Sequence, residues 1–170
     1  MHLKEIIITA IVVIIIYIVV NIVYKKLRTN YIDKTMLKLS EKYNFSYKKV
    51  NNICDYIIEK DGKKYLLKLC YIPSNSCVTI NAKDTICLTY GGRKNDYGRI
   101  YPHKRYLNEM VRFLNYEDGT TKIIAFYPET EKIMMYINES EIKFVKSSDS
   151  PYRMKYISFS DLDEKMNDIL

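Results

Sequence analysis

The chain contains few of the residues from which metal sites and nucleophilic active sites are usually built. Among its 170 residues there are two histidines and four cysteines. Cys54, Cys70, Cys77 and Cys87 do not form the closely spaced pairs that zinc sites use. A Ser/His/Asp or Cys/His site would have to use His103, which lies in a basic segment without a nucleophile motif. The composition therefore argues against zinc binding and nucleophilic catalysis.

Glycine-rich motifs and internal repeats are also missing. Gly91 and Gly92 are adjacent, but no Gly-Lys-Ser/Thr sequence accompanies them, and the pair alone is no phosphate-binding loop. No repeat or low-complexity segment occurs outside the apolar N-terminus. Function classes that depend on a glycine-rich phosphate loop are disfavoured.

The N-terminus carries one long apolar run, from Ile6 to Tyr24, in which Asn21 is the one strongly polar side chain. A helix over this run is about 29 Å long, which is close to the thickness of the hydrocarbon core of a bilayer. A cleaved signal peptide is the alternative, but no small-x-small cleavage pattern follows the run, and Lys25 and Lys26 come directly after it. We therefore predict a single-pass transmembrane helix in the cell membrane.

The charges beside this run predict its orientation. Lys25, Lys26 and Arg28 follow the run, whereas Lys4, offset by Glu5, precedes it. Cationic flanks favour the cytoplasmic side of the membrane. We expect the part of the chain after the anchor to be cytoplasmic, with the lipid bilayer as its first partner.

We therefore expect two parts in the chain, an anchor with a basic flank, residues 1–29, and a cytoplasmic domain, residues 30–170. A domain of this size can bury a core without disulfides or metal. The net charge of +7 is weak evidence for an anionic partner, because Lys, Asn, Ile and Tyr are frequent throughout. Cys54 and Cys70 lie in apolar segments, so we expect them to be core residues in a reducing compartment.

Hydrophobic periodicity predicts an alternation of helices and strands. An amphipathic helix follows the anchor, with Ile32, Met36, Leu39 and Tyr43 at helical spacing. A loop is predicted at 91–104, a helix at 104–116, and a last helix from Ser160, whose hydroxyl is the expected N-cap. Strands are predicted at 46–50, 77–81, 86–90, 121–127, 132–137, 142–145 and 154–159.

Residues 54–72 form the most informative segment, because Asp61-Gly62 is a strong signal for a two-residue hairpin turn. Such a turn fixes the register, so that Lys60 faces Lys63 and Asp55 faces Lys68. Both faces of the two strands are apolar, which is typical of central strands covered on both sides. We therefore predict an α/β domain with three layers and a mixed sheet.

The stretch from Asp55 to Lys68 resembles the PD-(D/E)xK superfamily of restriction-endonuclease-like nucleases. In that pattern an acid on one strand is followed by Glu-x-Lys on the next, with a helix before and further strands and a helix after. The resemblance implies Asp55 as a catalytic, metal-binding aspartate and Lys68 as the catalytic lysine. Leu66 stands in place of the second carboxylate, and Cys54 stands in place of the proline.

The departure at Leu66 weakens the case for cleavage, since two carboxylates are needed to hold the magnesium ions. Glu59 shares the face of Asp55 but lies roughly 13 Å along the strand at about 3.3 Å per residue. Asp84, Glu109 and Glu117 are poor replacements as well. We expect no cofactor, with Mg²⁺ bound at Asp55 only if the domain is an active nuclease. From the residues alone, we predict that Asp55 and Lys68 form a cross-strand ion pair.

A basic cluster lies between residues 91 and 105, interleaved with Tyr97 and Tyr101. Such a cluster can bind phosphates of nucleic acid or anionic lipid head groups, and tyrosines can stack on bases. The alternative is a solvated segment of a lysine-rich protein. The candidate residues are Arg93, Lys94, Arg99, Lys104 and Arg105.

Three functions remain open at this point. The first is a membrane-anchored module with an inactive nuclease-like fold that acts by binding a protein, nucleic acid or lipid. The second is a membrane-tethered, magnesium-dependent nuclease. The third is a subunit of a membrane protein assembly that has no ligand of its own.

Overall fold

The computed structural model describes residues 2–91, 99–138 and 141–170. The chain divides into two compact units, Met1–Lys42 and Tyr43–Leu170.

The first unit is the N-terminal part of one helix, α1 (His2–Tyr43), which covers both the apolar run and the predicted amphipathic segment. The helix is long and apolar enough to cross a membrane, although a signal sequence near an N-terminus meets the same description. Along the apolar run the side chains are exposed, whereas Ile32, Met36 and Leu39 are buried at the predicted helical spacing.

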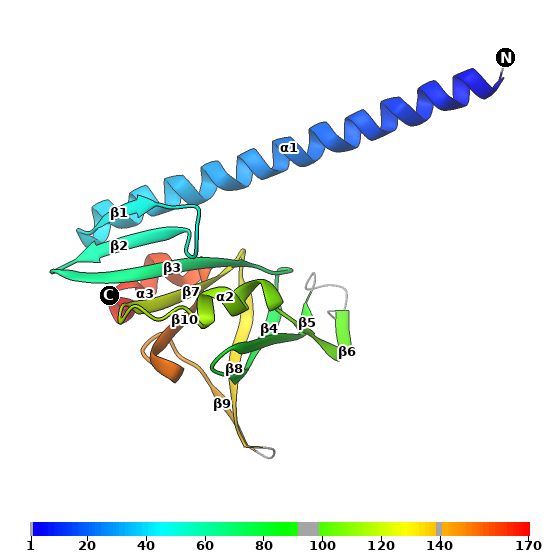
Figure 1. Ribbon diagram of the computed structural model, residues 1–170. Helices are drawn as coiled ribbons and strands as arrows, with labels where there is room; N and C mark the ends of the chain where they lie inside the picture. The colour runs from blue at the N-terminus through cyan, green and yellow to red at the C-terminus, as the bar shows by residue number, and fades with distance from the viewer. Residues whose placement is uncertain (1, 92–98, 139–140) are drawn as a thin grey trace. The chain divides into compact units, whose positions relative to one another are not determined.

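The second unit contains two five-stranded sheets, shown in Figure 1. In the first sheet the antiparallel strands β1, β2 and β3 are followed by β7, parallel to β3, and β10, parallel to β7. These strands are β1 (Ser46–Lys49), β2 (Tyr56–Lys60), β3 (Lys63–Tyr71), β7 (Thr121–Tyr127) and β10 (Met154–Ser158).

The second sheet has the order β6-β5-β4-β8-β9. Strands β4 and β8 pair in parallel, and the other neighbours pair antiparallel. Its strands are β4 (Ser76–Ala82), β5 (Thr85–Gly91), β6 (Arg99–Tyr106), β8 (Thr130–Asn138) and β9 (Glu141–Phe144). The domain is thus α/β with mixed sheets, as predicted, but it has two sheets where the sequence predicts one.

The core explains the difference from the predicted layers. Leu66, Ile124 and Tyr156 of the first sheet belong to the same buried cluster as Ile80 and Leu88 of the second. One face of the first sheet therefore packs against another sheet, whereas the sequence predicts a helical layer there.

The predicted helix at 104–116 is wrong in extent. Residues up to Tyr106 belong to β6, where Arg105 pairs with Leu88 of β5. Only a 3-10 turn (Asn108–Met110) and the short helix α2 (Val111–Leu114) follow. The predicted loop at 91–104 is also wrong at its end, since β6 begins at Arg99; residues 92–98 lie outside the described part of the chain.

The last helix, α3 (Leu162–Ile169), begins one residue later than predicted, because an N-cap at Ser160 would make Asp161 the first helical residue. A 3-10 turn (Phe159–Asp161) precedes it, and another (Pro151–Arg153) precedes β10. Asp161 occupies the N-cap position without a capping side-chain hydrogen bond. Ser160 Oγ lies 3.2 Å from Asp161 Oδ1, so the predicted Ser160 cap is wrong.

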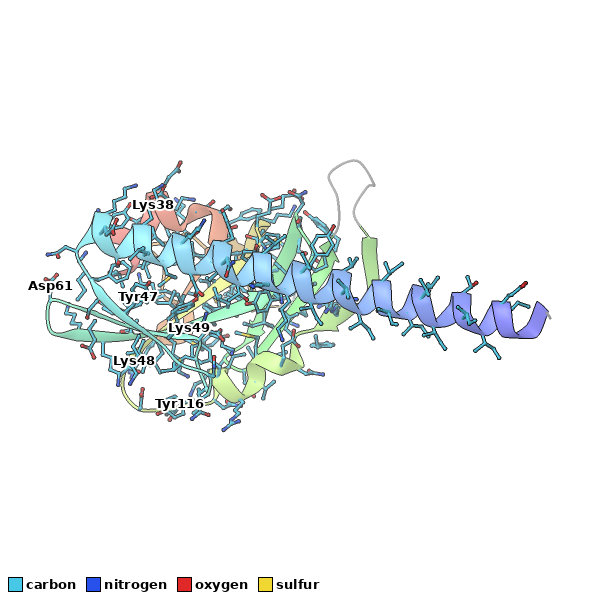
Figure 2. The ribbon with its side chains drawn as sticks, turned by 90° about the horizontal axis from the view of Figure 1, so that it is seen from above. Lys38, Tyr47, Lys48, Lys49, Asp61 and Tyr116 are labelled. Atoms are coloured by element: carbon cyan, nitrogen blue, oxygen red, sulfur yellow. The ribbon has the colours of Figure 1, made fainter. Side chains whose placement is uncertain are left out.

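The hairpin between β2 and β3 is confirmed in type and register. Asp61 and Gly62 have φ values of 51° and 73°, as a turn with two left-handed residues requires. Lys60 pairs with Lys63 and Ile57 with Leu66. Asp61 is labelled at the tip of this hairpin in Figure 2.

Candidate functional site

Asp55 and Lys68 form an ion pair beside the hairpin. Lys68 Nζ lies 3.2 Å from Asp55 Oδ1. The other carboxylate oxygen accepts a hydrogen bond of 2.7 Å from the backbone N–H of Leu69, and the Asp55 N–H donates to the carbonyl of Leu67 at 2.9 Å. The side chains of Lys68 and Asp55 are 22% and 31% exposed. The contact predicted from the turn register is therefore present, and it is half-buried.

The neighbouring thiol does not add a nucleophile to this pair. Cys54 is buried, and burial raises the pKa of its thiol, with the Asp55 carboxylate as a second, smaller cause. A thiol with a raised pKa is protonated at neutral pH and is a poor nucleophile. Cys54 is a core residue, as predicted.

Leu66 occupies the position at which the resemblance places a second carboxylate. Its side chain is 3% exposed and belongs to the buried cluster shared by the two sheets. It lies on the same face of β3 as Lys68, because side chains two residues apart point to the same side. A magnesium ion at Asp55 would find no oxygen on Leu66, and the Lys68 ammonium would compete with it for Asp55 Oδ1.

The other acids considered as substitutes have different surroundings. Glu59 is exposed and pairs with Lys64 across the hairpin. Asp84 accepts a hydrogen bond from Thr85, and Glu117 forms an ion pair with Lys83. Glu109 lies in the 3-10 turn after β6. Within residues 2–91, 99–138 and 141–170, no three His, Cys, Asp or Glu side chains gather in a group that could hold a metal ion.

The basic cluster is described only in part. Arg93 and Lys94 lie outside the described residues, and Arg99 is the first residue of β6. Lys104 Nζ lies 4.8 Å from the centroid of the Tyr136 ring, at a distance typical of a cation–π contact. Arg105 is exposed on the same strand. Two members of the cluster are thus adjacent on β6, and one of them already contacts an aromatic ring.

The membrane-flanking residues lie on α1. Lys25 and Lys26 are exposed directly after the apolar run, and Arg28 follows within the same turn of the helix. Their position beside the run is the one on which the predicted orientation depends.

A cavity that the sequence does not predict lies at the start of β7. It has a volume of about 520 Å³, and we call it the Lys122 pocket. Lys122 is the sequence signal that could have indicated this cavity. It lies two and four residues before Ile124 and Phe126 in the same strand, so its side chain is on their buried face. Its lining residues are Lys83, Tyr116, Glu117, Asp118, Gly119, Thr120, Thr121, Lys122, Tyr152, Arg153 and Met154.

The described geometry thus offers two places of chemical interest. One is the Asp55–Lys68 pair, whose charged groups are bonded to each other and to Leu69, and the other is the Lys122 pocket. No family model, no curated protein and no solved structure matches the chain.

Proposed function

We propose that the chain is a single-pass membrane protein whose cytoplasmic domain acts by binding and does not cleave nucleic acid. The length and apolar character of α1 support the membrane anchor. Lys25, Lys26 and Arg28, placed after the apolar run, support the cytoplasmic side for the domain.

The domain is proposed to be an inactive relative of the PD-(D/E)xK nucleases. Helix α1 comes before the hairpin, Asp55 precedes β2 and Lys68 lies in β3. Strands β3 and β7 then pair in parallel, which makes the first sheet mixed. These features support the resemblance in the order of its elements.

One observation carries the absence of cleavage: Leu66 is a buried core residue at the position where a metal-binding carboxylate would be needed. One carboxylate oxygen of Asp55 contacts the Lys68 ammonium, and the other accepts a hydrogen bond from the N–H of Leu69. A carboxylate held in this way stabilises the hairpin, since both of its partners belong to β3. Binding is therefore the better-supported activity, and the proposed partners are the lipid bilayer, a membrane protein and nucleic acid.

The alternative is a magnesium-dependent nuclease that uses Asp55 and Lys68. The 3.2 Å contact between these two side chains is the observation in its favour, because it brings together the residues that the resemblance names. Its test is the incubation of the full chain, in detergent micelles, with supercoiled plasmid and Mg²⁺.

We expect the same low level of nicking from the wild type and from Asp55→Ala. Nicking that requires Mg²⁺ and disappears in both Asp55→Ala and Lys68→Met would overturn the proposal. The matched control is Lys63→Met, which removes an exposed lysine from the same strand without touching Asp55.

The orientation is tested separately with protease added outside intact cells that express the chain. The domain from Tyr43 to Leu170 should stay uncut until the cells are permeabilised. Digestion in intact cells would place the domain on the outer side and would contradict the proposed location.

A further inference from the structure

The Lys122 pocket is formed by three separate segments of the domain, around Lys83, 116–122 and 152–154. Lys83 comes from the turn between β4 and β5, and residues 116–120 come from the connection between α2 and β7. Lys122 lies in β7, and Tyr152 and Arg153 precede β10. A volume of about 520 Å³ is within the range of small-molecule sites.

The acids of the pocket have partners beside them. Glu117 is paired with Lys83, whose hydrogen bond is the main reason that the pKa of Glu117 is lowered; the charges of Lys122 and Arg153 contribute less. Asp118 accepts hydrogen bonds from the Thr120 hydroxyl and from the Thr120 N–H, the latter at 2.9 Å. Asp118 is thus hydrogen-bonded within its own loop, and Glu117 is paired with Lys83.

Lys122 is a buried cation at this site. The residue is 7% exposed, and its Nζ donates a hydrogen bond of 2.6 Å to the carbonyl of Leu114. The Phe113 ring centroid lies 5.7 Å from Nζ. An ammonium has three N–H donors, and Leu114 accepts one of them. Within the described part of the chain, Lys122 makes no ion pair.

Burying a charge is costly. Burial is the main reason that the pKa of Lys122 is lowered, and the nearby Lys83 lowers it further, whereas the charges of Glu117 and Asp118 raise it by less. A bound anion in contact with Lys122 would add a further negative charge and stabilise the ammonium. The pocket therefore combines a buried cation, Lys122, with a second cation, Arg153, that is exposed.

The backbone beside the pocket is strained. Tyr152 and Arg153 are consecutive residues with φ values of 54° and 61°, in the left-handed region that non-glycine residues seldom adopt. Conformations of this kind cluster at ligand sites. The strained pair presents one aromatic and one cationic side chain to the pocket, and Tyr116, labelled in Figure 2, adds a second aromatic ring.

We propose that the Lys122 pocket binds a mononucleotide, whose phosphate contacts Lys122 and Arg153 and whose base contacts the rings of Tyr116 and Tyr152. Arginine and lysine are the usual phosphate ligands, and arginine can bind two phosphate oxygens at once. Tyrosine rings stack on bases of any sequence. This inference goes beyond the proposed function, because no residue of the Asp55–Lys68 pair lines the pocket, and either can fail without the other.

The test is equilibrium dialysis of the full chain in detergent micelles against labelled adenosine monophosphate. We expect saturable binding that is weaker for adenosine, which lacks the phosphate, and for inorganic phosphate, which lacks the ring. Arg153→Gln should raise the dissociation constant roughly tenfold, since a charge-assisted hydrogen bond is lost. The control Lys63→Gln, on the opposite face of the first sheet, should bind like the wild type.

Two further variants keep the test independent of folding. Lys122→Met can unfold the domain, so Tyr152→Ala is measured beside it, and the melting temperature of each variant is recorded. The proposal is overturned if the wild type shows no saturable binding, or if Arg153→Gln and Tyr152→Ala both bind as the wild type does. It is also overturned if inorganic phosphate binds as tightly as the nucleotide, or if a single-stranded oligonucleotide binds the pocket while the mononucleotide does not.

Discussion

Leu66 and Lys122 are direct partners in the parallel pairing of β3 with β7, and both side chains are buried on the same face of the first sheet. The position that would need a carboxylate in an active nuclease therefore lies next to a buried lysine on the neighbouring strand. A carboxylate introduced at residue 66 would therefore have the side chain of Lys122 as its neighbour, and this lysine would compete with a metal ion for it.

The first prediction concerns the substitution Leu66→Glu. It should lower the free energy of unfolding by on the order of 3 kcal/mol, because a carboxylate replaces a core leucine. The cost should be smaller than that of Leu67→Glu, since Leu67 is fully buried on the other face and pairs with Ile123. Urea denaturation of the full chain in detergent micelles measures both values.

The coupling between residues 66 and 122 gives this prediction its control. Leu66→Glu combined with Lys122→Met should cost at least about 1 kcal/mol more than the sum of the single changes, because the new carboxylate loses its cation. If Leu66→Glu and Leu67→Glu cost the same, the neighbouring ammonium has no influence and the prediction is wrong.

The second prediction concerns Asp55 and Lys68. Because the two side chains are 31% and 22% exposed, solvent screens their attraction, and Lys68→Met should cost only about 1 kcal/mol. Asp55→Ala should cost more, about 2 kcal/mol, since it also removes the acceptor of the Leu69 N–H. Denaturation curves of the two variants and of Lys63→Met provide the comparison.

The third prediction concerns the apolar run of α1. If this segment crosses the bilayer, the full chain should remain in the membrane fraction after washing with high salt and with alkaline carbonate. Replacing Ile14 and Ile15 by lysine should release the chain, because each charge in the centre of a membrane helix opposes insertion by about 3 kcal/mol. Carbonate release of the wild type would indicate a peripheral protein or a processed signal sequence.

The fourth prediction concerns the thiols. Cys54, Cys70, Cys77 and Cys87 are free and buried, and burial raises the pKa of Cys70 to about 12. A disulfide reagent at pH 8 should therefore react slowly with the thiols of the native chain. Once urea unfolds the chain, the reagent should react rapidly with all four thiols.

An exposed cysteine in Ser148→Cys should react at once and serves as the control. Rapid reaction of more than one thiol in the native wild type would contradict the burial of these residues. The measurement is the release of the coloured thiolate over time.

Local patterns were sufficient to predict the hairpin. Asp61-Gly62 favours positive φ at both positions, and the turn then fixes the register over the whole of β2. The contact between Asp55 and Lys68 followed from that register, at a separation of 13 residues. Their contact was predictable because no distant part of the chain is needed to set it.

The second sheet and the Lys122 pocket depend on contacts that periodicity does not encode. Tyr65 pairs with Thr121 and Val78 with Ile133, and no short-range signal says which of several apolar strands will be neighbours. The helix predicted at 104–116 failed for the same reason. Arg105 and Tyr106 pair with β5, so the α-helix is limited to Val111–Leu114.

The order in which the strands enter the two sheets has a consequence for how the domain is made. The chain adds β1, β2 and β3 to the first sheet, β4, β5 and β6 to the second, then β7 to the first, β8 and β9 to the second, and β10 to the first. Neither sheet can therefore be completed before most strands of the other sheet have been synthesised. Pairings between such distant segments form slowly, because a long loop must close before they gain any stability. A ribosome that stalls before Met154 holds a chain in which the first sheet lacks its last strand, so the domain can complete its fold only late in translation.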